Sequence, residues 1–220
     1  MKAEAVFDFL KKLSRNNNRE WFEKNKGKYL EIKEMFDAFA VELFEQIVMF
    51  DESIATQDPK KLTFRIYRDV RFSKDKTPYK THMSAAYSSV GKGLGKPGYY
   101  IQIEPGNKSF IGIGQYMPDA ENLSRIRQEI DYNGDNLKKA FKEKSFKKYY
   151  DAFWDGDALK TSPKGYPKDH PHAEWLKLKS FIITHEFSDA DVLSKTFLKN
   201  IAAAAKAGKP LNDFLNEALA

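Results

Sequence analysis

The residues best suited to chemistry lie in one segment, RIYRDVRFSKDKTPYK, at positions 65–80. It holds three arginines and three lysines against two aspartates. With two further lysines, residues 60–80 carry a surplus of six positive charges, which equals the net charge of +6 of the whole 220-residue chain. Arginine binds carboxylate and phosphate oxygens in a bidentate manner, and lysine adds point charge. The segment therefore predicts an anion-binding surface.

Strand-like alternation from residue 62 to residue 72 would fix where these side chains point. One face would carry Arg65, Tyr67, Asp69 and Arg71. Arg68 would fall among apolar residues on the other face, where an unpaired guanidinium is costly. We therefore expect Arg68 to bind either a carboxylate such as Glu104 or a ligand. The alternative is a solvated basic strand end with internal Arg–Asp pairs.

Eight residues form the predicted ligand-binding set: Arg19, Arg65, Arg68, Arg71, Lys74, Lys76, Tyr79 and Lys80. Arg19 joins the set because it lies at the expected start of a helix, where free amides favour anions. Three residues are candidates for proton transfer: Glu104, Asp69 and His82. For Glu104, a role as the partner of Arg65 or Arg68 is favoured over a role as a base.

Other chemistries lack the residues that they need. The chain has no cysteine, which excludes thiol catalysis, disulfides and iron–sulfur clusters. The segment KDHPH offers Asp169, His170 and His172, but a metal needs three or four convergent ligands. We therefore predict no metal and no cofactor.

The elements that position these residues can be predicted from periodicity. Helical spacing covers 3–13 and roughly 18–49, the second with Asn17 and Glu20 at the spacing of a capping box. Period-two patterns follow at 62–67 and 82–90, then in a hairpin at 98–116 that turns at Glu104–Lys108. A glycine-rich loop is expected at 92–98 and an irregular loop at 161–172. Further helical runs, the first capped by Asp119, cover about 119–130, 134–154, 173–187, 189–206 and 210–219.

This order predicts an α+β fold: about four mainly antiparallel strands, packed by a long N-terminal helix and a C-terminal group of helices. We expect one domain over residues 1–220. Hydrophobic residues make up 41% of the chain and aromatics 14%, so the core should be rich in aromatic rings. The N-terminus lacks a secretory signal and no stretch reaches the roughly 18 apolar residues of a membrane span, so we expect a cytoplasmic protein without membrane contact.

Four functions are compatible with the basic segment. The leading hypothesis is binding of an anionic small molecule that bears phosphate or carboxylate. Nucleic-acid binding is the second, because Tyr67, Phe72 and Tyr79 are interleaved with the cations and could stack on bases. The third is an enzyme that orients its substrate with the same arginines. The fourth is a structural or protein-interaction role in which Arg–Asp and Arg–Glu pairs only stabilise the fold.

Four motifs carry a family resemblance: N-x-R-E-W-F at 17–22, R-x-x-R-D-x-R-F-S-K-D-K-x-P-Y-K at 65–80, G-Y-Y-I-Q-I-E-P-G at 98–106 and P-K-G-Y-P-K-D-H-P at 163–171. In this order, from about Phe7 to Phe214, the chain resembles the mostly bacterial family called domain of unknown function 2461. The resemblance implies a single domain. It draws attention to Arg19, Glu20, Trp21 and the charged residues of 65–80, and it assigns no role to any of them.

Overall fold

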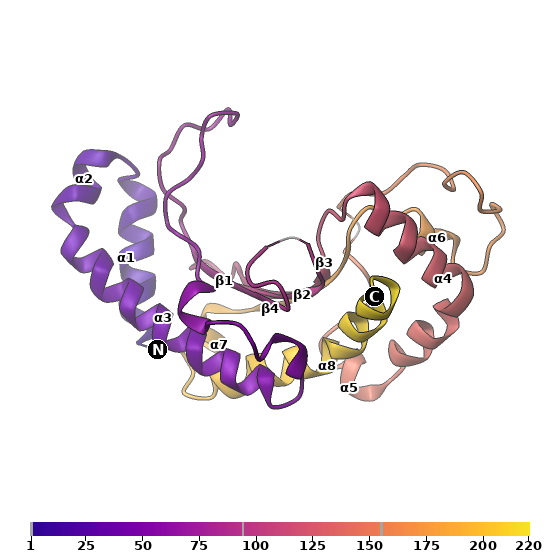
Figure 1. The fold of residues 1–220 in the computed structure, drawn as a ribbon. Helices are drawn as coiled ribbons and strands as arrows, with labels where there is room; N and C mark the ends of the chain where they lie inside the picture. Colours follow the sequence, from indigo (N-terminus) through magenta and orange to yellow (C-terminus); the bar gives the residue numbers. More distant parts are fainter. Residues whose placement is uncertain (1, 94, 155) are drawn as a thin grey trace.

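The computed structural model describes residues 2–93, 95–154 and 156–220. Figure 1 shows a sheet in the middle, N-terminal helices on one side of it and the α4–α6 region on the other. The helices are α1 (Ala3–Arg15), α2 (Arg19–Lys24), α3 (Lys26–Val48), α4 (Ala120–Ala140), α5 (Lys144–Lys147), α6 (Ala173–Leu176), α7 (Asp189–Leu193) and α8 (Phe197–Ala218), with short 3-10 turns η1 (Glu52–Ile54) and η2 (Pro59–Lys61).

The sheet has four antiparallel strands in the order of the sequence. They are β1 (Met83–Ser88), β2 (Gly98–Ile103), β3 (Ser109–Gln115) and β4 (Phe181–Phe187). Tyr100 of β2 lies opposite Ala86 of β1 and Gly112 of β3, and Gly112 in turn lies opposite Thr184 of β4. The predicted α+β class, with an antiparallel sheet between N-terminal and C-terminal helices, is confirmed.

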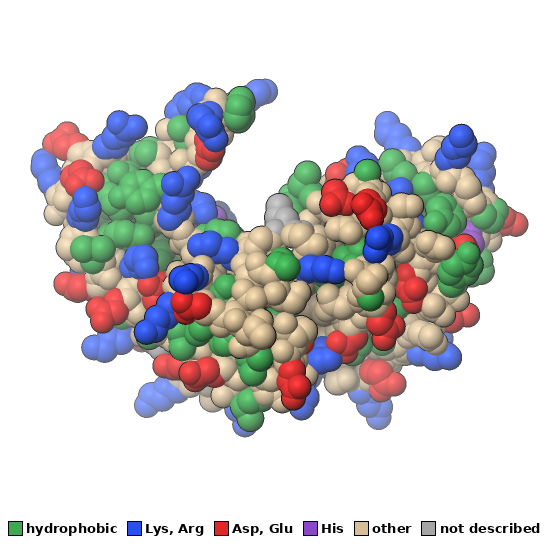
Figure 2. All heavy atoms as spheres, viewed as in Figure 1, with side chains coloured by type: hydrophobic (Ala, Val, Ile, Leu, Met, Phe, Trp, Pro, Cys, Tyr) green, Lys and Arg blue, Asp and Glu red, His purple; other side chains and the backbone are tan. Residues whose placement is uncertain are grey.

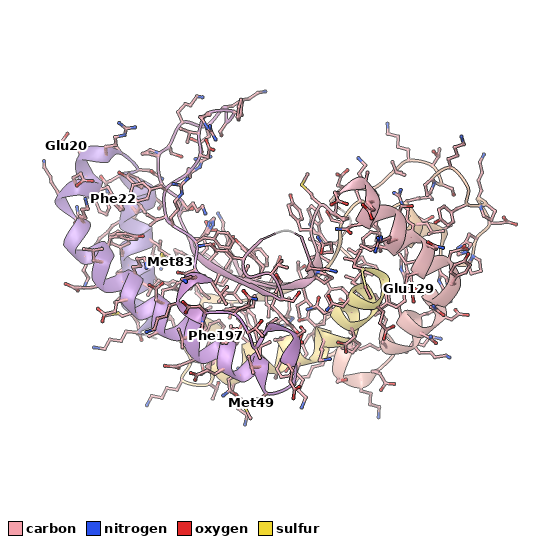
Figure 3. All side chains as sticks on the ribbon, viewed as in Figure 1. Glu20, Phe22, Met49, Met83, Glu129 and Phe197 are labelled. Carbon is pink, nitrogen blue, oxygen red and sulfur yellow. The ribbon has the colours of Figure 1, made fainter. Side chains whose placement is uncertain are left out.

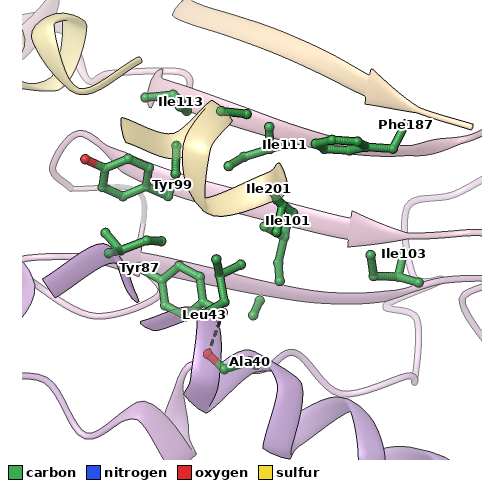
Figure 4. Packing of buried hydrophobic residues seen from close by; sticks show 14 of the residues in the cluster. Ala40, Leu43, Tyr87, Tyr99, Ile101, Ile103, Ile111, Ile113, Phe187 and Ile201 are labelled. Carbon is green, nitrogen blue, oxygen red and sulfur yellow. Dashed lines mark hydrogen bonds between the residues drawn. The ribbon is translucent and has the colours of Figure 1, made fainter. Parts of the chain in front are cut away.

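One face of the sheet forms the core. Alternate residues of β2 point to this face, and Tyr99, Ile101 and Ile103 are buried there. Figure 4 shows these side chains together with Ile201 of α8, and the Tyr87 hydroxyl donates to the carbonyl of Ala40 at 2.9 Å. The helices α3 and α8 thus cover the same side of the sheet.

Close contact of α8 with the sheet depends on Gly208. A Cβ at this position would lie 2.4 Å from Cδ1 of Ile113, so a larger residue would require the isoleucine side chain or the helix to shift. Pro210 follows within the same helix, which continues through it to Ala218. The prediction of two separate helices at 189–206 and 210–219 was therefore wrong in this detail.

No helix within residues 2–93, 95–154 and 156–220 covers the opposite face of the sheet. Figure 1 shows every helix below or beside the sheet in that view, and Figure 2 shows the molecule hollowed between its two raised flanks. Gly98, Tyr100 and Gln102 of β2 alternate with the core residues and face this side. The open face is therefore a sheet surface that the core does not use.

Three predicted elements differ from those of the structure. The helix expected at 173–187 ends at Leu176, and the β-branched run at 181–187 forms the fourth strand instead. The strand expected from residue 62 is reduced to isolated bridges, such as Thr63 with Ala85, beside the edge strand β1. The helix expected at 134–154 also differs, because α4 starts earlier and ends at Ala140.

The N-terminal helical region differs from the predicted one in a break at Asn25 and in its N-cap residue. The helix predicted at 18–49 is broken at Asn25, whose side chain bonds the carbonyl of Trp21 and ends α2. The N-cap is Asn18, which accepts from the amide of Trp21, whereas Asn17 bonds a different part of the chain. Asp119 caps α4 as predicted. Of the described helices, none is long and apolar enough to span a bilayer.

Candidate functional site

The basic segment forms a projecting arm, residues 65–80, that rises above the sheet beside the N-terminal helices (Figure 1). Its two sides pair near the base, where the amide of Arg68 donates to Pro78 at 2.9 Å and the amide of Lys80 donates to Ile66 at 2.8 Å. The rest of the arm extends away from the core (Figure 1). We call residues 65–80 the basic arm.

The base of the basic arm is anchored on α2. The Asn17 side chain donates to the carbonyl of Tyr79 at 2.9 Å and accepts from its amide at 3.1 Å. The Tyr79 ring stacks on Phe22, labelled in Figure 3, with centroids 4.0 Å apart, and it is only 3% exposed. Tyr79, a predicted ligand-binding residue, therefore belongs to the core.

Two of the predicted arginines have partners within the arm. Arg68 pairs with Asp75 and with the Thr77 hydroxyl, and it donates to the Thr77 carbonyl at 3.2 Å. Arg71 holds Asp69 through bonds of 2.9 and 2.6 Å. That guanidinium lowers the pKa of Asp69 to about 2, so the carboxylate stays ionised as an ion-pair partner. Arg68 thus binds a carboxylate, one of the two expected alternatives, but the partner is Asp75 and not Glu104, which bonds Thr81 and Gln102.

Other predicted residues lie on the outside of the molecule. Lys74 and Lys76 sit at the exposed part of the arm, where Lys76 donates to the carbonyl of Val70 at 2.9 Å. Arg19 is exposed at the start of α2. The structure therefore does not bring Arg19, Arg71, Lys74 and Lys76 together with the open face of the sheet.

Three cations instead gather where the arm meets the sheet. The ammonium of Lys80 lies 5.2 Å from the Phe64 ring centroid, and that of Lys92 lies 5.7 Å from it. Burial lowers the pKa of Lys80, and the positive charges of Arg65 and Lys92 lower it further. Among the described residues, no ion pair joins any of these three cations to a carboxylate. We call Arg65, Lys80 and Lys92 the cation cluster.

A cavity of about 520 Å³ lies on the open face beside the cation cluster. Its floor contains Tyr100, Phe110 and small residues of the sheet, and its walls include Phe64, Tyr116 and Trp154. Of the described residues lining it, only Lys92 and Lys96 are charged, and both are cations. Such a size and aromatic lining are typical of small-molecule sites. We call this cavity the sheet cleft.

A chain of polar groups leads along the open face toward Glu104. The Tyr100 hydroxyl donates to Gln102 at 2.9 Å, and the Gln102 amide donates to Glu104 at 2.8 Å. The hydroxyl of Thr81 donates to the other oxygen of Glu104 at 2.9 Å. Glu104 is thus bonded as a carboxylate acceptor, and it positions Gln102 and Tyr100 at the sheet cleft.

His82 lies next to this chain, with Nδ1 3.7 Å from Glu104 and its side chain 22% exposed. Burial lowers the pKa of His82 to about 4, and the nearby Lys80 ammonium acts in the same direction. The imidazole is therefore neutral at pH 7, and it can accept a hydrogen bond or a proton from a group placed beside it.

This pKa shift predicts acid sensitivity. The folded-state pKa of about 4 lies below the ordinary value of 6.5, so the unfolded state binds the proton first as the pH falls. The contribution of His82 to the free energy of unfolding is complete above pH 6.5 and is lost as the pH falls to 4, by up to about 3 kcal/mol. Chemical denaturation at both pH values should show a smaller loss for His82→Asn than for wild type. Parallel losses would contradict the assignment.

The two other histidines considered as metal ligands fix a loop. His170 Nε2 lies 2.9 Å from Asp131, and His172 Nε2 lies 3.4 Å from Asp135, so both imidazoles tie the 161–172 loop to α4. His172 also stacks on Trp175, with centroids 5.0 Å apart. Within the described part of the chain, no group of three or more potential metal ligands converges.

The predicted residue set missed most of the sheet cleft. Phe64, Lys92, Tyr100, Tyr116 and Trp154 line it and were not among the candidates. One feature of the sequence could have indicated the cleft. In the hairpin at 98–116, the residues of the face opposite the core include Gly98, Gly112 and Gly114, whereas a face covered by a helix would carry large apolar residues. The glycine-rich loop at 92–98 supplies Lys92 and Lys96, while Leu94 lies outside the described residues.

Comparison with known proteins identifies a family. The sequence profile of the family described as conserved hypothetical protein (DUF2461) matches residues 5–214, nearly the whole chain. No curated protein and no solved structure shows significant similarity to the chain. The chain belongs to the DUF2461 family of conserved hypothetical proteins.

Proposed function

We propose that the protein binds an anionic small molecule in the sheet cleft, with the cation cluster as the site of the phosphate or carboxylate. The observation that carries this proposal is that Lys92 and Phe64 line a cavity whose described lining has no carboxylate, while the ammonium of Lys80 lies 5.2 Å from the centroid of the same Phe64 ring. Mutual repulsion within the cation cluster disfavours the ligand-free state, and a bound anion would relieve it.

The proposed anion site includes the base of the basic arm, with Arg65 and Lys80. It does not include residues 68–77, which we call the outer arm. Arg68 and Arg71 already neutralise Asp75 and Asp69, so binding a ligand there would first require breaking an ion pair. Among the described residues no carboxylate forms an ion pair with the cation cluster, and Lys92 donates to the neutral carbonyl of Thr63 at 3.0 Å. Charge-assisted hydrogen bonds from such cations contribute about 1.5–3 kcal/mol each.

A matched pair of variants tests the proposal. Lys80→Met with Lys92→Met removes two charges at the cleft, and Arg71→Met with Lys74→Met removes two charges from the outer arm. Isothermal titration calorimetry with AMP, glucose 6-phosphate, citrate and benzoate should find at least one ligand for wild type. The cleft variant should lose about tenfold or more in affinity for that ligand, while the outer-arm variant should retain it.

Thermal unfolding of the ligand-free protein provides a second test. Removing the Lys80 charge relieves repulsion, so Lys80→Met alone should raise the melting temperature of the ligand-free protein while lowering its affinity for the anion. Loss of binding in the outer-arm variant but not in the cleft variant would contradict the proposal. So would the absence of binding to all four anions.

A further inference from the structure

We propose that the ligand is an aromatic anion, in which a planar ring lies in the sheet cleft and a phosphate or carboxylate meets the cation cluster. This inference rests on the proposed function and adds the chemical class of the ligand. It is carried by the aromatic side chains that line the cleft away from the lysines.

Three aromatic rings lie side by side across the cleft, Tyr100 and Phe110 in its floor and Phe64 in the adjoining wall. The Tyr100 centroid lies 6.2 Å from Phe64 and 5.6 Å from Phe110, so the rings form a continuous row across the open face. Phe64 links this row to the cation cluster, because Lys80 and Lys92 both approach its ring. A ring placed on this floor would therefore have its charged substituent next to the cations.

The wall at the other end of the cleft is also aromatic. Tyr116 follows β3 and is 44% exposed, and Trp154 is 38% exposed, with their centroids 6.3 Å apart. The amide of Trp154 donates to the carbonyl of Ile182 at 2.8 Å, which fixes Trp154 at the edge of the sheet. Large aromatic residues held at an open cavity provide stacking surface for a planar ligand.

Small residues leave space between floor and wall. The sheet positions around Tyr100 are occupied by Ala86, Gly98, Gly112, Gly114 and Thr184, all of which line the cavity. The resulting volume of about 520 Å³ lies in the range of sites for single small molecules. An aliphatic anion would use the lysines but not the five rings, and a neutral aromatic compound would use the rings but not the lysines.

Three probes separate these possibilities by calorimetry on the full chain. They are 1-naphthyl phosphate, hexyl phosphate with the same charged group, and 1-naphthalenemethanol with the same ring. We expect 1-naphthyl phosphate to bind wild type at least about tenfold more tightly than either of the other two compounds.

Two variants locate the ring. Tyr116→Ala with Trp154→Ala should reduce the affinity for 1-naphthyl phosphate about tenfold and leave that for hexyl phosphate unchanged. Tyr132→Ala is the control, because Tyr132 is an exposed aromatic residue of α4 that does not line the cleft. Thermal unfolding of each variant would show that the fold is intact.

The outcomes distinguish the two proposals. Equal affinity for the two phosphates would overturn the aromatic class of the ligand while the proposed anion site would stand. If 1-naphthalenemethanol binds as tightly as 1-naphthyl phosphate, the anion site itself is wrong and the aromatic cleft remains. If none of the probes binds, both proposals fail.

Discussion

Gly112→Val should abolish binding of anionic ligands in the sheet cleft while the protein stays folded. A Cβ at Gly112 would lie 3.6 Å from the Phe110 ring and 4.0 Å from Cγ2 of Thr184, which are ordinary contacts. Both of these residues line the cavity, so the valine methyl groups would take up space that a ligand needs. Valine also favours strands more than glycine does.

The expected loss is at least about a hundredfold in affinity, since even one extra methylene group in a pocket is worth about 1–3 kcal/mol. Calorimetry with the wild-type ligand measures it, and circular dichroism confirms the fold. Gly112→Ala serves as the intermediate case and should lose less. Unchanged affinity in Gly112→Val would show that the ligand binds elsewhere.

Gly114→Ala, in contrast to Gly112→Val, should destabilise the protein severely. The two glycines are only two residues apart in β3. Gly114 has φ = +122°, a conformation that residues other than glycine rarely adopt. A Cβ there would lie 1.9 Å from the backbone carbonyl oxygen of Phe181, and backbone atoms in a paired strand cannot move aside.

We expect Gly114→Ala to lower the free energy of unfolding by at least about 3 kcal/mol, measured by chemical denaturation. Total stability of a domain is about 5–15 kcal/mol, so much of the chain could be unfolded at 37 °C. Gly112→Ala is the matched control. If the two alanine variants were equally stable, the path of β3 against β4 would be wrong.

The fold could be predicted where local patterns determine it. The first strand of the hairpin at 98–116 alternates between half-buried and buried residues, and it pairs with the second strand, so neighbouring residues contain the information. The fourth strand could not be recognised in this way. Its partner β3 lies more than sixty residues earlier, and the preceding residues 173–176 do form a helix, which made a longer helix plausible.

Only part of the candidate site could be predicted, because local sequence does not show which charged residues pair in the folded chain. Charge density pointed to the basic arm, but charge alone does not distinguish arginines that are paired within the arm from lysines that are not. Asp75 lies seven residues from Arg68 and captures it through a turn at Thr77. Lys92 and Trp154 reach the cleft from distant loops, so their placement depends on the completed fold.

The most direct measurement is a crystal structure of the protein with 1-naphthyl phosphate. It should show a phosphate oxygen about 3 Å from Nζ of Lys80 or Lys92, with the naphthyl ring on the Tyr100 side of the sheet. A phosphate bound instead to Arg71 and Lys74 on the outer arm, with the space above Tyr100 unfilled, would contradict the account.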